Sequence, residues 1–197
     1  VGAWNFARLL ESISPLMEEP KSLHEALDSY YESYRGHSSR MWAQKLGLDE
    51  FQEGDEGLVS ELTSLMQLTE TDMTILFRTL STMQEPDSNH LDRAFYEEGE
   101  IPENEWNSWL DRWWNRVDGQ PDRESMLNSN PKYVLRNWIA QLAIDAAEKE
   151  DYSVATALYE MLKKPYDEQP GNEEKWFSRR PEWARNRVGC SMLSCSS

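Results

Sequence analysis

Cysteine is nearly absent from this 197-residue sequence and occurs only at Cys190 and Cys195. Small folds that depend on disulfide bonds carry cysteines along the whole chain, so we expect no disulfide framework here and a reducing, cytoplasmic setting. No apolar run approaches the ~20 residues that a membrane-spanning helix requires. The first residues, from Val1, resemble neither a start methionine nor a signal peptide. We therefore expect a piece of a longer chain that has no membrane partner.

Positive charge is also scarce. The chain has 20 Lys and Arg residues against 36 Asp and Glu, which gives a formal net charge of −16. Nucleic acids and anionic membranes are bound through cationic surfaces, so this balance argues against both classes of partner. The mean hydropathy is low, at −0.79. Nine Trp, eight Tyr and five Phe nevertheless supply enough aromatic surface for a folded core.

Motifs of nucleotide and metal chemistry are missing as well. The sequence contains neither GxGxxG nor GxxxxGK[ST], the loops that cradle phosphates, and neither HRD nor DFG of a protein kinase. His24, His37 and His90 have no partners at the spacing of metal ligands. The sequence predicts no catalytic, cofactor-binding or metal-binding residue within this chain.

Helical periodicity is what the chain does have, almost throughout, and no segment has the alternating pattern of a strand. We predict an all-α fold with a helical region over residues 1–164. In its second helix Ser22 is the expected N-cap, and Gly36 can interrupt the pattern. From Pro165 the pattern gives way to proline, glycine and charge, so residues 165–197 are predicted to form an irregular tail that ends in Ser-Cys-Ser-Ser.

The clearest predicted helix follows Asn130-Pro131, because proline suits the first turn of a helix and the apolar period beyond it is near 3.6. Asp151 is expected to cap the next helix, and the short connection between the two predicts an antiparallel pair. The residues expected in the main core of this pair are Trp138 and Leu142 on the first helix, facing Leu158 and Met161 on the second.

Four tryptophans, at positions 106, 109, 113 and 114, form a cluster that allows two interpretations. A platform for a sugar or a methylated lysine is one. Core packing is the interpretation that their helical spacing favours.

The segment from Lys175 to Arg187 reverses the charge balance of the chain, with five basic residues and one acidic residue. Such a segment can dock on the acidic body or on an acidic partner, or it can be an ordinary basic tail. The C-x4-C spacing of Cys190 and Cys195 is not the CxxC of redox or zinc motifs.

Residues 130–141, NPKYVLRNWIAQ, resemble the NP-x-x-x-LRN-x-x-AQ motif of the selenoprotein O (SelO) family. Arg180-Pro181-Glu182-Trp183-Ala184 resembles the RPP-x-W block of that family, although this chain reads Arg179-Arg180-Pro181-Glu182 where the family usually reads RPP. Residues 4–9, WNFARL, are similar to its WNLARL block. The chain ends in Ser194-Cys195-Ser196-Ser197, with cysteine where some relatives carry selenocysteine. The resemblance spans the whole chain.

The resemblance implies a protein-kinase-like fold whose later helices correspond to this chain. It implies an activity that transfers AMP from ATP to Ser, Thr or Tyr hydroxyls of proteins, with Mg²⁺ or Mn²⁺. The nucleotide-binding, metal-binding and catalytic residues of the family lie before its WNLARL block, so none maps onto residues 1–197. The implied partners are the N-terminal kinase-like portion of the same protein and the protein substrates.

One family feature does map onto this chain. Cys195 matches the position that can form a disulfide with a cysteine of the activation segment, which would lie upstream of Val1. A bridge from Cys190 to Cys195, or two free thiols, remain alternatives. For the chain as a whole, the alternative to a fragment of an adenylyltransferase is a self-standing, acidic helical module for protein interaction.

Overall fold

The computed structural model describes residues 1–16, 21–96 and 101–190. In these ranges the chain is helical, which confirms the all-α prediction there, and the extended pairing is limited to one antiparallel bridge between Thr71 and Phe95. The α-helices are α1 (Gly2–Ile13), α2 (Lys21–Leu46), α3 (Asp55–Leu68), α4 (Met73–Thr82), α5 (Glu103–Arg116), α6 (Arg123–Ser129), α7 (Asn137–Ala147), α8 (Ser153–Leu162) and α9 (Pro170–Trp176). The 3-10 helices are η1 (Ser14–Leu16), η2 (Ser88–Ala94) and η3 (Glu182–Ala184).

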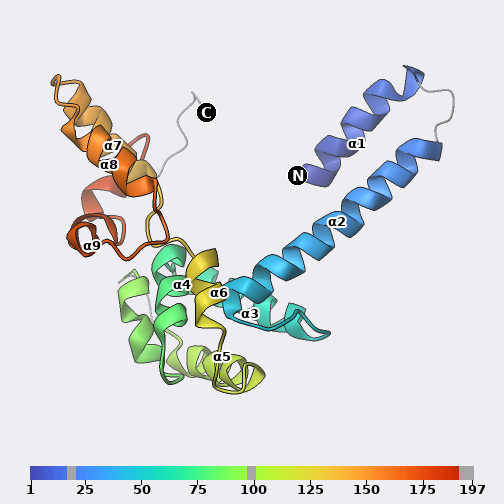
Figure 1. Ribbon diagram of the computed structural model, residues 1–197, viewed down its shortest axis with the longest axis horizontal. Helices are drawn as coiled ribbons and strands as arrows, with labels where there is room; N and C mark the ends of the chain where they lie inside the picture. The colour runs from blue at the N-terminus through green and yellow to red at the C-terminus, as the bar shows by residue number, and fades with distance from the viewer. Residues whose placement is uncertain (17–20, 97–100, 191–197) are drawn as a thin grey trace.

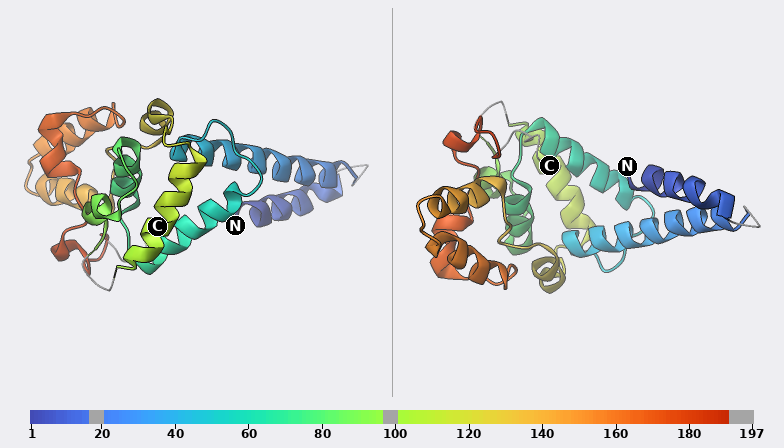
Figure 2. Two further views of the ribbon diagram at one scale, coloured as in Figure 1. Left: turned by 90° about the horizontal axis from the view of Figure 1, so that it is seen from below. Right: turned by 90° about the horizontal axis from the view of Figure 1, so that it is seen from above.

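The elements form a body with a helical hairpin on either side of it (Figure 1). Helices α3 to α6 make the body. Helices α1 and α2 project from one side as a long hairpin, while α7 and α8 lie side by side at the other end (Figure 2). Among the described helices, none has both the length and the apolar composition needed to cross a bilayer.

The tryptophan-rich helix α5 lies at the centre of the core. Trp106, Trp109 and Trp113 are fully buried, and the rings of Trp109 and Trp113 stack with their centroids 5.9 Å apart. Each indole N–H donates a hydrogen bond: Trp106 to the Thr69 hydroxyl, Trp109 to the Leu58 carbonyl and Trp113 to the Leu46 carbonyl. The helical spacing therefore serves core packing, as the second interpretation of the cluster expected.

Helix α7 begins at Asn137 and not at Pro131, so the helix predicted to follow Asn130-Pro131 starts six residues later than expected. The backbone N–H groups of Lys132 and Tyr133 both donate to the carbonyl of Pro165, at 2.8 and 3.0 Å. These long-range bonds hold residues 131–136 outside the helix, because an amide committed to Pro165 cannot continue a helical ladder. The expected antiparallel pair with α8 does form.

Helix α2 is continuous from Lys21 to Leu46, so Gly36 does not interrupt it and Ser22 lies inside the helix instead of capping it. One glycine costs only about 1 kcal/mol relative to alanine in a helix interior. The ladder of hydrogen bonds on both sides of Gly36 outweighs that cost.

The predicted irregular tail contains helix α9, which starts at Pro170. Proline led to the prediction of an irregular tail because it interrupts helices, but it is also favoured in the first turn of a helix, which is where Pro170 lies. Trp176 and Phe177 at the end of α9 are buried in the core, as are Ala184 and Cys190 further along. We refer below to residues 165–190 as the C-terminal segment.

Candidate functional site: the ion-pair network beneath the C-terminal segment

Three charged side chains are buried where the C-terminal segment meets the body. Arg78 and Lys132 expose 5% of their surface and Asp72 exposes 7%. A buried charge is costly unless it is paired and hydrogen-bonded. The partners of these three residues therefore define a constrained polar part of the described chain.

Asp72 is the N-cap of α4 and pairs with Arg136, the N-cap of α7. The Asp72 carboxylate accepts a hydrogen bond from the backbone N–H of Ile75, which fixes it at the start of α4. Arg136 Nη2 donates to Asp72 Oδ1 at 2.8 Å, and Arg136 Nη1 donates both to Asp72 Oδ2 and to the carbonyl of Ser178. This bidentate pair joins α4, α7 and the C-terminal segment.

A second set of pairs centres on Glu168, which precedes α9. Lys132 Nζ donates to Glu168 Oε2 at 2.7 Å and to Glu173 Oε2 at 2.9 Å. Arg78 donates to the other oxygen of Glu168 and to the carbonyls of Leu127 and Asn130. The hydrogen bond from Lys132, with that from Arg78, lowers the pKa of Glu168 against the opposing effect of burial. The pKa of Lys132 is raised, because its two carboxylate partners outweigh burial, which acts to lower it.

Asn130 completes the network on the side of α2. Its side-chain amide donates to the carbonyl of Lys45 at 3.0 Å, and Lys45 Nζ donates back to Asn130 Oδ1 at 3.1 Å. Burial lowers the pKa of Lys45. Asn130 is 1% exposed, so the first residue of the predicted NP-x-x-x-LRN motif is a buried link between α2 and α6 and not a helix start.

The basic stretch from Lys175 to Arg187 docks on the body, the first of the arrangements considered for it. Arg179 donates to the carbonyl of Phe95, and Arg180 Nη2 donates to Glu70 Oε1 at 3.0 Å. The guanidinium of Arg180 also lies over the ring of Tyr96, 5.0 Å from its centroid. Arg187 makes a bidentate pair with Asp145 of α7, which lowers the pKa of that carboxyl.

Of the two cysteines, the structure describes only Cys190. Cys190 is 6% exposed and forms no disulfide. It lines a hollow of about 410 Å³ beside Asp72, Tyr96, Trp138 and Arg180. Cys195, the predicted redox residue, lies outside the described residues.

The network contains acids and bases that are committed to one another. Throughout the described ranges, no three His, Cys, Asp or Glu side chains are grouped as they would be around a metal ion. Charge-assisted hydrogen bonds hold the C-terminal segment to α4 and α7, and Asn130 and Arg78 link α2 and α6 to the same network.

Sequence reasoning located this network only in part. The motif pointed to Asn130, Arg136 and the block around Arg180, but not to their partners Lys45, Asp72 and Glu70. Arg78, Lys132 and Glu168 were not singled out at all. A signal was present for Arg78, because an Arg on the apolar face of α4 needs a buried partner.

Comparison with known proteins identifies the family that this chain resembles in sequence. The sequence model of the family described as protein adenylyltransferase SelO matches residues 1–163. The protein nucleotidyltransferase YdiU of Flavobacterium johnsoniae is 44% identical to this chain over 211 aligned residues, with all of this chain and 40% of the relative covered. Proteins of the same name from Aromatoleum aromaticum and Rhodopirellula baltica are 42% and 41% identical, again with all of this chain and 39% and 41% of the relatives covered.

The chain thus spans about 40% of the length of the curated relatives it matches. The family model covers most of the chain, and the residues of the NPKYVLRNWIAQ motif form the buried links described above. The chain belongs to the SelO family.

Proposed function

We propose that this chain is the C-terminal part of an ATP-dependent protein adenylyltransferase, and that it has a structural and redox-regulatory role in the whole enzyme. Family membership carries this proposal, because the matched relatives are named as protein nucleotidyltransferases. The intact protein then works in the cytoplasm on Ser, Thr or Tyr hydroxyls of other proteins.

The proposed reaction is a substitution at the α-phosphorus of ATP. A hydroxyl oxygen of the protein substrate bonds to the α-phosphorus, and the bond from that phosphorus to the oxygen bridging to the β-phosphate breaks. Pyrophosphate leaves, and the hydroxyl proton passes to a base. A bound Mg²⁺ or Mn²⁺ supplies charge neutralisation on the phosphates.

We place the residues for that chemistry in the part of the protein outside residues 1–197. This chain contributes rigidity instead, since its buried charges tie the C-terminal segment to α4 and to the residues that precede α7. Its large exposed apolar side chains support a role within a bigger protein. Trp4 on α1 is 65% exposed and Tyr34 on α2 is 62% exposed.

The redox role rests on Cys195, for which we propose a disulfide with a cysteine upstream of Val1. Such a bond would join the two ends of a long loop and restrict both. Cys190 is buried against the body, so its thiol is poorly accessible to a partner cysteine.

The experiment that tests the function compares ATP labelled at the α-phosphate with ATP labelled at the γ-phosphate, using the full-length protein and a panel of candidate proteins. Stable labelling of protein from the α-position alone is the expected result. Labelling from the γ-position would indicate a phosphotransferase and overturn the proposal.

A second measurement tests whether residues 1–197 alone have the activity proposed for the full-length protein. Residues 1–197 alone should show neither AMP transfer nor heat of binding when titrated with Mg-ATP. Micromolar ATP binding to this chain, abolished by one point mutation, would refute the placement of the site. The alternative, a helical interaction module, would be favoured by a different result. In that case the full-length protein labels no protein from either position of ATP but still binds partners through α1 and α2.

A further inference from the structure

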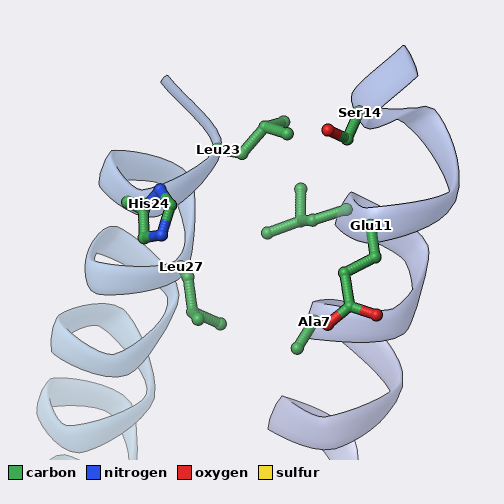
Figure 3. Close-up of a pocket in the computed structure, with 7 residues that line it drawn as sticks. Ala7, Glu11, Ser14, Leu23, His24 and Leu27 are labelled. Atoms are coloured by element: carbon green, nitrogen blue, oxygen red, sulfur yellow. The ribbon is translucent and has the colours of Figure 1, made fainter. Parts of the chain in front are cut away.

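The inner part of α2 packs on α4 and α6, but beyond the point where α1 stops one of its faces, with Tyr34, Ser38 and Trp42, lines a groove. Helix α1 runs beside the outer half of α2, and its first residue, next to the N label, lies level with the middle of α2 (Figure 1). The two helices are antiparallel. Leu10 of α1 and Ser14 of η1 share a hollow of about 190 Å³ with Leu23 and Leu27 of α2 at the tip of the hairpin (Figure 3).

The register of the hairpin can be followed down to the start of α1. The rings of Phe6 and Tyr30 stack with centroids 5.2 Å apart, and a Cβ atom on Gly2 would lie 2.6 Å from the Tyr30 hydroxyl. Residue numbers on α1 therefore fall as those on α2 rise. A chain continuing α1 backwards from Val1 would pass Tyr34, then Ser38, then Trp42.

A groove lies along that path. It measures about 440 Å³ between α2 and α3, and we call it the α2–α3 groove. Its lining residues are Tyr34, Arg35, Ser38, Ser39, Trp42, Phe51, Glu56, Val59 and Ser60. Tyr34 and Trp42 line it from α2, and the Tyr34 ring stacks on Tyr30 with centroids 6.3 Å apart, which continues the stack of Phe6 and Tyr30 to the groove.

Surface exposure changes along the same line. Tyr30, beside α1, is half-buried, whereas Tyr34, one turn further, is 62% exposed. Val1 caps α1 without a side-chain hydrogen bond, and its carbonyl accepts from Asn5 N–H at 3.0 Å.

We propose that the α2–α3 groove is the seat of the polypeptide that immediately precedes Val1 in the full-length protein, as a backward continuation of α1. From Tyr30 to Trp42 is twelve positions on α2, so about twelve preceding residues, or ~18 Å of helix at 1.5 Å per residue, reach the far end of the groove. The face turned to α2 should carry apolar residues three and four positions apart. The inference rests on the proposed function only in that this chain forms the C-terminal part of a longer protein.

The test is site-specific photocrosslinking in the full-length protein. The photoreactive residue p-benzoyl-phenylalanine is placed at Ser60, an exposed rim position of the groove on α3. A matched control replaces Ser33, which is exposed and lies five positions from Ser38, about 140° around α2. Crosslinked peptides are then identified by mass spectrometry.

We expect crosslinks from position 60 into the about twelve residues before Val1, at least tenfold more abundant than any from position 33 into that segment. Crosslinks from position 60 that reach only other parts of the protein or a second copy, or no crosslink at all, would overturn the proposal. AMP transfer is assayed on the same samples. If the protein is inactive but gives the expected crosslinks, the proposed function is refuted and the proposal for the α2–α3 groove stands. If the protein transfers AMP but does not give these crosslinks, the groove proposal is refuted and the proposed function stands.

Discussion

Arg136 joins three parts of the chain through one guanidinium group, at α4, α7 and Ser178. Removing one partner of a buried ion pair leaves the other charge buried and unpaired, which costs about 3–5 kcal/mol. We therefore expect Arg136→Ala to lower the free energy of unfolding, measured with urea, by about that amount. Lys163→Ala, which removes an exposed pair with Glu160 on α8, is the control and should change stability by no more than ~0.5 kcal/mol. Similar decreases in the free energy of unfolding in the two variants would show that the buried pair of Arg136 and Asp72 contributes little to stability.

Glu168 gives the network a dependence on pH. Its pKa lies below the ordinary value of 4.5 when the protein is folded, because Lys132 and Arg78 donate to it. The unfolded state then binds the proton more readily, so this contribution to stability is complete above pH ~4.5 and is lost as the pH falls through the folded pKa. The raised pKa of Lys132 acts at the other limit, where its contribution is lost as the pH rises above the ordinary value of 10.5.

We expect Glu168→Gln to destabilise the protein at pH 7, and the difference from wild type to shrink as the pH is lowered below 4.5. Urea unfolding followed at intervals from pH 7 to pH 3 measures this. Glu182→Gln, at a side chain that is 82% exposed, is the control. A difference between Glu168→Gln and wild type that stays constant over this range would contradict the linkage.

At the scale of elements, Gly36 in the continuous helix α2 and Gly119 after α5 differ in how well they can accept a side chain. A Cβ atom on Gly36 would meet no atom within 4 Å, whereas Gly119 has φ +67° and its Cβ would lie 3.2 Å from the Trp114 indole nitrogen. Gly36→Ala should therefore stabilise the chain by about 0.4–1 kcal/mol, by reducing the freedom of the unfolded state. Gly119→Ala should destabilise it by ~1 kcal/mol or more, because alanine is strained at positive φ. Thermal melts of the two variants check the sign of each change, and a destabilising Gly36→Ala would indicate a break in α2.

Helices α7 and α8 are held together by few large side chains, among which Trp138 stands out. It is 6% exposed and lies in the core with Leu158 and Met161, whereas Leu142 is only half-buried. Trp138→Ala should cost about 3–5 kcal/mol in urea unfolding, and Leu142→Ala clearly less. Ile144→Ala, at a side chain that is 50% exposed, should stay within ~0.5 kcal/mol of wild type. A loss below ~1 kcal/mol for Trp138→Ala would mean that this face is assigned wrongly.

The elements that the sequence predicted well are those whose own residues decide their structure. The tryptophan spacing of α5 places its buried face, which is a local effect. The start of α7 was missed because a carbonyl 33 positions away, at Pro165, takes the N–H of Lys132. The pairs of the network were missed for the same reason, since a sequence pattern shows that Arg136 needs a partner but not that the partner is Asp72.

At the scale of the whole protein, the disulfide proposed for Cys195 would make AMP transfer by the full-length protein sensitive to redox conditions. In the full-length protein, Cys195→Ser should remove the difference in AMP transfer between oxidised and reduced samples. Cys190→Ser should keep that difference, because its thiol is buried against the body. Rates of transfer in both variants, with and without a reductant, test this. Equal redox responses in wild type and Cys195→Ser would refute the assignment.

The separation of Asp72 from its partner also has a consequence for biosynthesis. Arg136 follows Asp72 by 64 positions, so at about 5–20 residues per second the ribosome adds it roughly 3–13 seconds later. Glu168, the partner of Arg78, is added later still, 90 positions after it. Until then a nascent chain can form α4 but must keep Asp72 and Arg78 in water. A product truncated before residue 130 would therefore carry permanently unpaired charges on α4, which distinguishes an unfinished chain from a finished one.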